Sequence, residues 1–426
     1  MSIRKRLLLY AILFAAASLT ALLFAAHPLG PDYSLRALGS VRLAGSAEGE
    51  SLGFPDNWVM RTDERLKTPV SIRQGETLGI ISDRSVVSVP RHGYSTLGEG
   101  LLATGDPAAD PPAGSLVITA DGGVFEVERA ERIWSGGERI LAFADGGRRV
   151  ADISDAITVS GREYTDDEPL VMAIDPHGEQ DSNGREDRRE SHNNVREHES
   201  SARSSISPEW FMLPAPVTAA SSFGQTAATG DALGGITLLS AGAPHELDEG
   251  FERLEPFEPE AHGSILSLAF GPSGEDEEAS TLFAVGGYEP SQLLRIEISA
   301  DSGFGRRSSI DLPGSVNRPV HLRVSGEHVL LAAGGSLLVY DRDLEPVAQR
   351  SFDAAVRETG FLADGRLVFA YTEDQELFEV DVFYVDDLDV MYSLTFPRSL
   401  DSIRTAGDTL VAADRRQTLF YGEDFR

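Results

Sequence analysis

Acidic side chains dominate the groups that could do chemistry in this chain. Its 426 residues include 68 Asp or Glu and 37 Lys or Arg, and there is no cysteine. That absence excludes disulfides, thiolate metal sites and cysteine nucleophiles. No GxxxxGK phosphate-binding loop, GxSxG nucleophile turn or HExxH zinc motif occurs. The sequence therefore favours a protein that is not an enzyme, and we assign no catalytic, cofactor-binding or metal-binding residue and no cofactor.

The densest group of carboxylates inside a repeated unit comprises Asp381, Asp386, Asp387 and Asp389. Oxygen ligands of this kind suit calcium. The spacing departs from the EF-hand pattern because no glycine follows, and apolar residues flank the acidic pair. We therefore expect Asp386 and Asp387 to form the turn of a β-hairpin.

The histidines show no recurring ligand spacing. His177, His192 and His198 lie in a polar segment, where a metal site would require flexible imidazoles to converge. A solvated loop that contains histidine is the simpler interpretation. His321 and His328 flank a β-rich run, and we expect structural or surface roles for both.

The net charge of −31 narrows the class of partner. A surface this negative repels phosphate backbones, which argues against nucleic-acid binding, and it also disfavours lying flat on anionic lipid. Solubility is the simplest role for the charge. Adaptation to a salty exterior is the alternative, since Lys5 and Lys67 are the only lysines.

One segment is long enough to cross a membrane. Residues 7–26 (LLLYAILFAAASLTALLFAA) carry no charge, follow Arg4-Lys5-Arg6 and end at His27-Pro28. As a helix, a segment of this length spans about 30 Å, the thickness of the hydrocarbon core. We favour an uncleaved single-pass signal anchor within residues 1–30, with a cleaved signal and a secreted protein as the alternative. In both cases the basic end stays in the cytoplasm and the rest lies outside it.

Residues 31–426 have the pattern of a single β-rich domain. Short alternating apolar runs are broken by Gly, Asp, Asn and Pro, which is typical of many strands joined by turns. Residues 177–206 contain almost no apolar side chain and cannot bury enough surface to offset the entropy lost on ordering. We expect a disordered polar insertion there, with a domain boundary as the alternative.

Repeated units indicate the fold. Residues 327–343, 365–381 and 407–424 each contain a β-rich run, a tight turn and a second β-rich run that ends in an acidic residue. Residues 356–362 and 391–396 supply a strand before and a strand after the second unit, which makes four. Such a sheet has two apolar faces, and neighbouring sheets in a ring cover both.

The repeat spacing is seen in leucines central to the β-rich runs, which are Leu238, Leu282, Leu330, Leu367 and Leu410. The intervals of 44, 48, 37 and 43 residues are close to the roughly 40–45 residues of a four-stranded propeller blade. Earlier markers are less regular and fall at Leu78, Leu116, Ile140 and Leu170. We predict an all-β propeller of about seven four-stranded blades, with eight as the alternative. A strand within residues 33–38 or 40–44 would close the ring.

Two hairpins resemble the central strands of known propeller repeats. LLAAGGSLLVYDRD and LVFAYTEDQELFEVD are similar to hairpins of WD40-type and quinoprotein-type propellers. The resemblance covers residues 33–426 apart from the insertion, and it is one of architecture. Where WD40 repeats have Trp-Asp, this chain has Tyr340-Asp341, Val380-Asp381 and Glu423-Asp424.

Together these features predict a membrane-anchored propeller outside the cytoplasm, held in the cytoplasmic membrane by residues 7–26. Its expected role is a non-enzymatic protein-binding or scaffold module of the cell envelope, with an envelope protein as partner. The alternative is an extracytoplasmic enzyme that acts on a polysaccharide or small metabolite at the mouth of the channel. Convergence of His, Arg and carboxylate side chains at one end of the ring would indicate that alternative. A structural adhesin is a third possibility.

Overall fold

The computed structural model describes most of the chain between residues 33 and 425. The described ranges are 33–41, 69–81, 85–90, 94–97, 101–104, 115–119, 123–136, 139–158, 170–173, 204–224, 226–240, 252–253, 263–273, 276–286, 291–299, 303–313, 316, 319–374 and 377–425. The expected membrane anchor, residues 7–26, lies outside them. Within these ranges no helix is both long and apolar enough to span a membrane.

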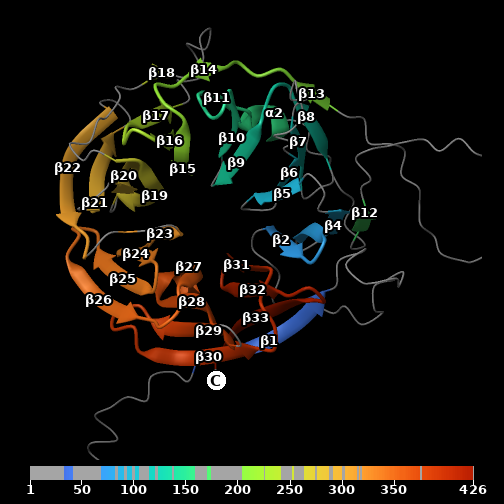
Figure 1. The fold of residues 1–426 in the computed structure, drawn as a ribbon, viewed down its shortest axis with the longest axis vertical. Coiled ribbons are helices and arrows are strands. Elements are labelled where there is room, and N and C mark those ends of the chain that lie inside the picture. The colour runs from blue at the N-terminus through green and yellow to red at the C-terminus, as the bar shows by residue number, and fades with distance from the viewer. Residues whose placement is uncertain are drawn as a thin grey trace, which may run out of the picture.

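The described strands form eight sheets that Figure 1 shows arranged in a ring. Four sheets each consist of four consecutive antiparallel strands. These strands are β15 (Val217–Phe223), β16 (Thr226–Asp231), β17 (Ile236–Ser240) and β18 (Glu252–Arg253); β19 (Ile265–Ser273), β20 (Asp276–Gly286), β21 (Gln292–Ser299) and β22 (Gly303–Asp311); β23 (Val320–Ser325), β24 (His328–Ala333), β25 (Ser336–Asp341) and β26 (Pro346–Ser351); and β27 (Val356–Leu362), β28 (Leu367–Asp374), β29 (Leu377–Tyr384) and β30 (Val390–Phe396).

The other four sheets each receive an outer strand from elsewhere in the chain. The strands are β2 (Val70–Gln74), β3 (Thr77–Ile81) and β4 (Ser85–Pro90) with β12 (Leu170–Ala173); β5 (Tyr94–Leu97), β6 (Leu101–Thr104), β7 (Ser115–Ile118) and β8 (Val124–Val127) with β13 (Ser204–Ile206); β9 (Arg132–Gly136), β10 (Arg139–Ala144) and β11 (Arg149–Asp152) with β14 (Phe211–Met212); and β31 (Ser402–Ala406), β32 (Thr409–Ala413) and β33 (Thr418–Phe425) with β1 (Tyr33–Val41). Among the described residues, the helical segments are α2 (Ser154–Thr158) and the one-turn η1 (Ala363–Gly365).

The ring is continuous on its inner side. The inner strands, in order β2, β5, β9, β15, β19, β23, β27 and β31, each contact the next, and β31 contacts β2. The preferred count of seven blades is not confirmed, because the described residues form eight sheets, the number named as the alternative. The spacing of the marker residues favoured seven blades because Leu170 was counted as the centre of a blade. Leu170 lies in β12, which is the outer strand of an earlier sheet, whereas Ile140 lies in a separate sheet.

Closure of the last sheet confirms the expected N-terminal strand. β1 pairs antiparallel with β33, from Tyr33 opposite Phe425 to Val41 opposite Thr418. The two ends of the described chain are therefore joined in one sheet, which Figure 1 shows as a blue strand beside the red C-terminal strands. β1 is thus the fourth strand of the last sheet, whose other three strands come from the C-terminal end of the described chain.

A single segment adds outer strands to three other sheets. β12 pairs in parallel with β4, β13 pairs in parallel with β8, and β14 pairs antiparallel with β11. Of the expected disordered insertion, residues 177–203 lie outside the described residues. Its last three residues, expected to be disordered, form β13, whose pairing with β8 satisfies backbone groups that would otherwise require water.

The apolar core lies between sheets. One buried cluster joins Phe369 and Val380 of the β27–β30 sheet to Ile403 and Leu410 of the next sheet. Comparable clusters fill other spaces between neighbouring sheets around the ring. The fold is therefore stabilised by burying both faces of each sheet against its neighbours, as the repeat pattern predicts.

Candidate functional site

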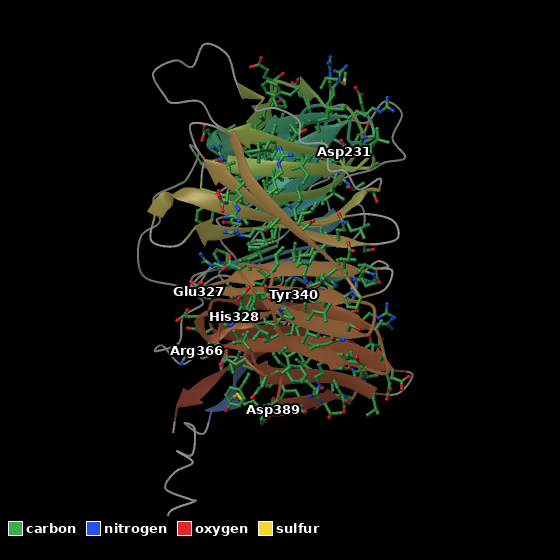
Figure 2. The ribbon with its side chains drawn as sticks, turned by 90° about the vertical axis from the view of Figure 1, so that its left-hand side faces the viewer. Asp231, Glu327, His328, Tyr340, Arg366 and Asp389 are labelled. Atoms are coloured by element: carbon green, nitrogen blue, oxygen red, sulfur yellow. The ribbon has the colours of Figure 1, made fainter. Side chains whose placement is uncertain are left out.

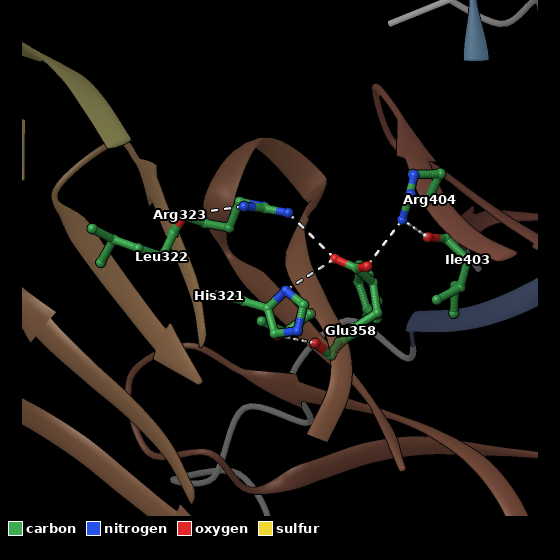
Figure 3. A network of polar contacts seen from close by, with 8 residues as sticks. His321, Leu322, Arg323, Glu358, Ile403 and Arg404 are labelled. Atoms are coloured by element: carbon green, nitrogen blue, oxygen red, sulfur yellow. Dashed lines mark hydrogen bonds and ion pairs between the residues drawn. The ribbon is translucent and has the colours of Figure 1, made fainter. Parts of the chain in front are cut away.

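Four polar side chains converge at the inner side of three consecutive sheets. His321 and Arg323 come from β23, Glu358 from β27 and Arg404 from β31, each strand being the innermost of its sheet (Figure 3). We call this group the Glu358 cluster. It brings together a carboxylate, an imidazole and two guanidinium groups from sheets that are separate in the sequence.

The alternation of side chains between the two faces of a strand determines where Arg323 and Arg404 point. Leu322 is 1% exposed and Ile403 is 2% exposed, and both belong to buried apolar clusters between sheets. Because successive residues of a strand point to opposite faces, burying these two leaves Arg323 and Arg404 on the other face. On β27 the pairing with β28 shifts between Val356 and Glu358. Such a bulge re-aims the side chain that follows it.

Glu358 is the centre of the cluster. Its Oε2 accepts a hydrogen bond of 2.9 Å from Nη1 of Arg404, and its Oε1 accepts one of 3.3 Å from Nη2 of Arg323. Nδ1 of His321 lies 3.5 Å from the same Oε1. The Glu358 side chain is 18% exposed, whereas Arg323 is 48% and Arg404 36% exposed. Two cationic groups thus face solvent from either side of one largely buried carboxylate.

The surroundings disfavour the charged forms of His321 and Arg323. Burial lowers the pKa of His321; the nearby Glu358 raises it, and Arg323 and Arg404 lower it. Burial also lowers the pKa of Arg323, against the opposing effect of Glu358. Arg323 lies on the inner side of the ring, where its side chain is 48% exposed and is also surrounded by protein that reduces its solvation. An additional negative charge near these groups would stabilise their charged forms.

In the carboxylate-rich turns, aspartate side chains accept hydrogen bonds from backbone N–H groups. Oδ1 of Asp341 accepts hydrogen bonds from the backbone N–H of Asp343 at 2.9 Å and of Glu345 at 2.8 Å. Asp231 and Asp414 make the same kind of turn. In the described part of the chain no group of three or more His, Cys, Asp or Glu side chains is placed to hold a metal ion.

The expected hairpin turn at Asp386 and Asp387 is confirmed. β29 ends at Tyr384 and β30 begins at Val390, and Oδ1 of Asp387 accepts a hydrogen bond of 2.9 Å from the backbone N–H of Asp389. His328 lies near this turn, with its Nε2 3.7 Å from Oδ1 of Asp386. Figure 2 shows His328 beside Glu327 and Arg366 at one face of the ring.

Among the described outer strands, β12, β13, β14 and β30 contain no charged residue and no proline, and β30 is the longest of the four. It reads VMYSLTF, without a charged residue or a proline. The outer strands β18, β22, β26 and β1 all contain charged residues, and β26 also begins with a proline. Val390 is 44% exposed, and Ser393 and Thr395 are exposed as well. Charges and proline normally protect sheet edges from pairing with another chain, so β30 is the least protected of these edges.

The sequence did not reveal the Glu358 cluster. Of its members only His321 was considered, and a structural or surface role was expected for it. The available signal was local: His321 and Arg323 flank an apolar residue on a β-rich run, and Glu358 and Arg404 lie on the corresponding runs of the next two repeats. His177, His192 and His198 lie outside the described residues.

Comparisons with known proteins find a likeness of fold and none of sequence. The chain matches no family model, and no curated protein is similar in sequence. Among solved structures it is similar to BamB from Moraxella catarrhalis, with 12% identity, a TM-score of 0.51 and coverage of 91% of this chain and 98% of that one. It is also similar to BBS1N in complex with ARL6DN, with 12% identity, a TM-score of 0.44 and coverage of 76% and 86%. For apo AztD from Citrobacter koseri the values are 11%, 0.41, 78% and 95%. With its ring of sheets, the chain has the fold of a β-propeller.

Proposed function

We propose that the protein is an eight-bladed propeller that binds another protein of the cell envelope and has no catalytic role. The observation that carries the proposal is the unprotected outer edge of β30. β30 is the last strand of its sheet among the described residues, and its outer edge offers unpaired backbone groups. An extended segment of a partner could add to this edge as a further strand.

The ring itself shows that outer edges accept added strands. β13 makes a fifth strand in its sheet, and β12 is added to β4 in the same parallel manner. On β29, Glu379 lies opposite Thr395 and Asp381 opposite Ser393. Opposite residues share a face of the sheet, so the edge is bordered by carboxylates. The partner segment that fits is therefore uncharged or basic at alternate positions.

The test uses the full-length protein in native membranes, with a photo-crosslinking residue placed at Thr395 or, as a matched control, at Gln349. Gln349 is exposed on β26, whose edge carries Pro346 and Arg350. One envelope protein that crosslinks in stoichiometric amount from position 395 and not from position 349 supports the proposal. With the crosslinking residue kept at position 395, the substitution Ser393→Lys on the same strand should abolish that crosslink, because a lysine protects a sheet edge. Equal crosslinking from both positions, or none from either, contradicts the proposal.

The location of the domain is part of this proposal. The uncharged segment 7–26 after three basic residues favours a single-pass anchor with residues 31–426 outside the cytoplasm. A C-terminal fusion to a reporter that is active only outside the cytoplasm should be active and should remain with the membranes after carbonate extraction. Activity in the soluble fraction would indicate cleavage after the apolar segment instead.

One observation favours the alternative of an enzyme at the mouth of the ring. The Glu358 cluster brings together the His, Arg and carboxylate side chains that such an enzyme requires. However, both oxygens of Glu358 already accept hydrogen bonds from arginines, which leaves the carboxylate poorly placed to accept a proton from a substrate. Turnover of a substrate that is lost in Glu358→Gln would establish the enzyme.

A further inference from the structure

We propose that the Glu358 cluster is a binding site for a small anion that carries a carboxylate or phosphate group, held by Arg323 and Arg404. This inference does not depend on the proposed protein partner. It concerns the inner side of the ring, whereas the partner is proposed to bind the outer edge.

The first argument is the imbalance of charge. Two guanidinium groups share one carboxylate, and the third basic group, His321, is also turned toward it. In a chain with a net charge of −31, a place where cationic groups outnumber anionic ones requires a reason. A bound anion would balance the second guanidinium group.

The second argument is unused hydrogen-bonding capacity. Nη1 of Arg404 donates to Glu358 and to the carbonyl oxygen of Ile403, and the Nη atoms of Arg323 donate to Glu358 and to the carbonyl oxygen of Leu322. Nε and Nη2 of Arg404 and Nε of Arg323 have no partner within the described part of the chain. Carboxylate and phosphate oxygens match the paired donors of a guanidinium group.

The third argument is access combined with preorganisation. Arg404 is 36% and Arg323 48% exposed, so a small solute can reach both. Glu358 and the two backbone carbonyls fix one end of each guanidinium group, so that little conformational entropy remains to be lost on binding. The site is therefore prepared for an anion before the anion arrives.

The cluster also predicts how binding depends on pH. The charged groups that face His321 are Arg323 on its own strand, Glu358 on β27 and Arg404 on β31, together with the backbone carbonyl of Arg357. Burial keeps the pKa of free His321 below its ordinary value. A nearby anion raises that pKa, so binding takes up a proton and becomes tighter as the pH falls toward the pKa of free His321.

Isothermal titration calorimetry of the purified full-length protein tests the proposal, with inorganic phosphate and succinate as separate probes. We expect at least one probe to bind the unmodified protein with a stoichiometry of one. Arg404→Gln and Arg323→Gln should each weaken that binding at least about tenfold, which corresponds to the loss of about 1.4 kcal/mol. The matched control is Arg357→Gln, which removes one positive charge from the same region of β27, where the arginine is 54% exposed and pairs with Glu373.

Each outcome decides the question. Binding that is lost in the two cluster variants, kept in the Arg357 variant and tighter at lower pH supports the site, and the preferred probe identifies the chemistry. If neither probe binds at concentrations up to millimolar, the proposal is overturned. Equal weakening in all three arginine variants also overturns it, since that result indicates a general effect of charge. Circular dichroism of each variant confirms that a loss of binding is not a loss of fold.

Discussion

At the scale of single residues, His321 makes the stability of the ring dependent on pH. Burial, the largest effect, lowers the pKa of this imidazole in the folded protein, while Glu358 raises it and Arg323 and Arg404 lower it. In the unfolded chain the ordinary value of about 6.5 applies. The folded state therefore favours the neutral ring, and its contribution to stability is present above pH 6.5 and is lost as the pH falls through the folded pKa.

The variant His321→Gln isolates this contribution. Between about pH 7.5 and pH 5.5 the free energy of unfolding of the unmodified protein should fall more steeply than that of the variant. Urea unfolding at several pH values measures both curves. Parallel curves would show that the imidazole titrates alike in the folded and unfolded chains.

Asp341 illustrates a second residue-scale role, the support of a turn. Its Oδ1 accepts hydrogen bonds from two backbone N–H groups beyond the end of β25. Asp341→Ala should lower the free energy of unfolding by about 1 kcal/mol, because both donors lose their acceptor. Asp341→Asn keeps the acceptor oxygen and should cost much less. Thermal unfolding of both variants checks the difference; an equal loss would mean that the charge and not the hydrogen bonds matters.

At the scale of elements, the pairing of β1 with β33 should stabilise the folded ring. In Leu35→Pro/Arg36→Pro one of two successive N–H groups must face β33, since neighbouring N–H groups point to opposite sides of a strand. Proline removes that donor. We expect a loss of roughly 1–3 kcal/mol in the free energy of unfolding. The control Leu35→Ala/Arg36→Ala keeps both donors, and destabilisation as large as that of the proline pair would assign the effect to side chains.

The elements also show what the sequence could and could not predict. The strand at 356–362, the strand near 391–396 and the N-terminal closing strand were predicted because alternation and turn residues are local signals. The preferred number of seven sheets was not confirmed, and eight was only the alternative, because β12, β13 and β14 pair with strands far back in the chain. The Glu358 cluster was missed for the same reason: three strands that meet only at the inner side of the ring supply its members.

At the scale of the whole molecule, the net charge of −31 sets how the ring responds to salt. Like charges on a compact surface repel each other, and unfolding relieves that repulsion. Between about 0.01 and 1 M NaCl the Debye length falls from roughly 30 to 3 Å, so screening should raise the free energy of unfolding and then level off. Urea unfolding across this range, with sucrose as an uncharged control solute, measures the gain. A rise that continues well beyond 1 M would favour adaptation to a salty exterior, because screening is then complete. No gain at any concentration would remove that interpretation and leave solubility as the role of the acidic surface.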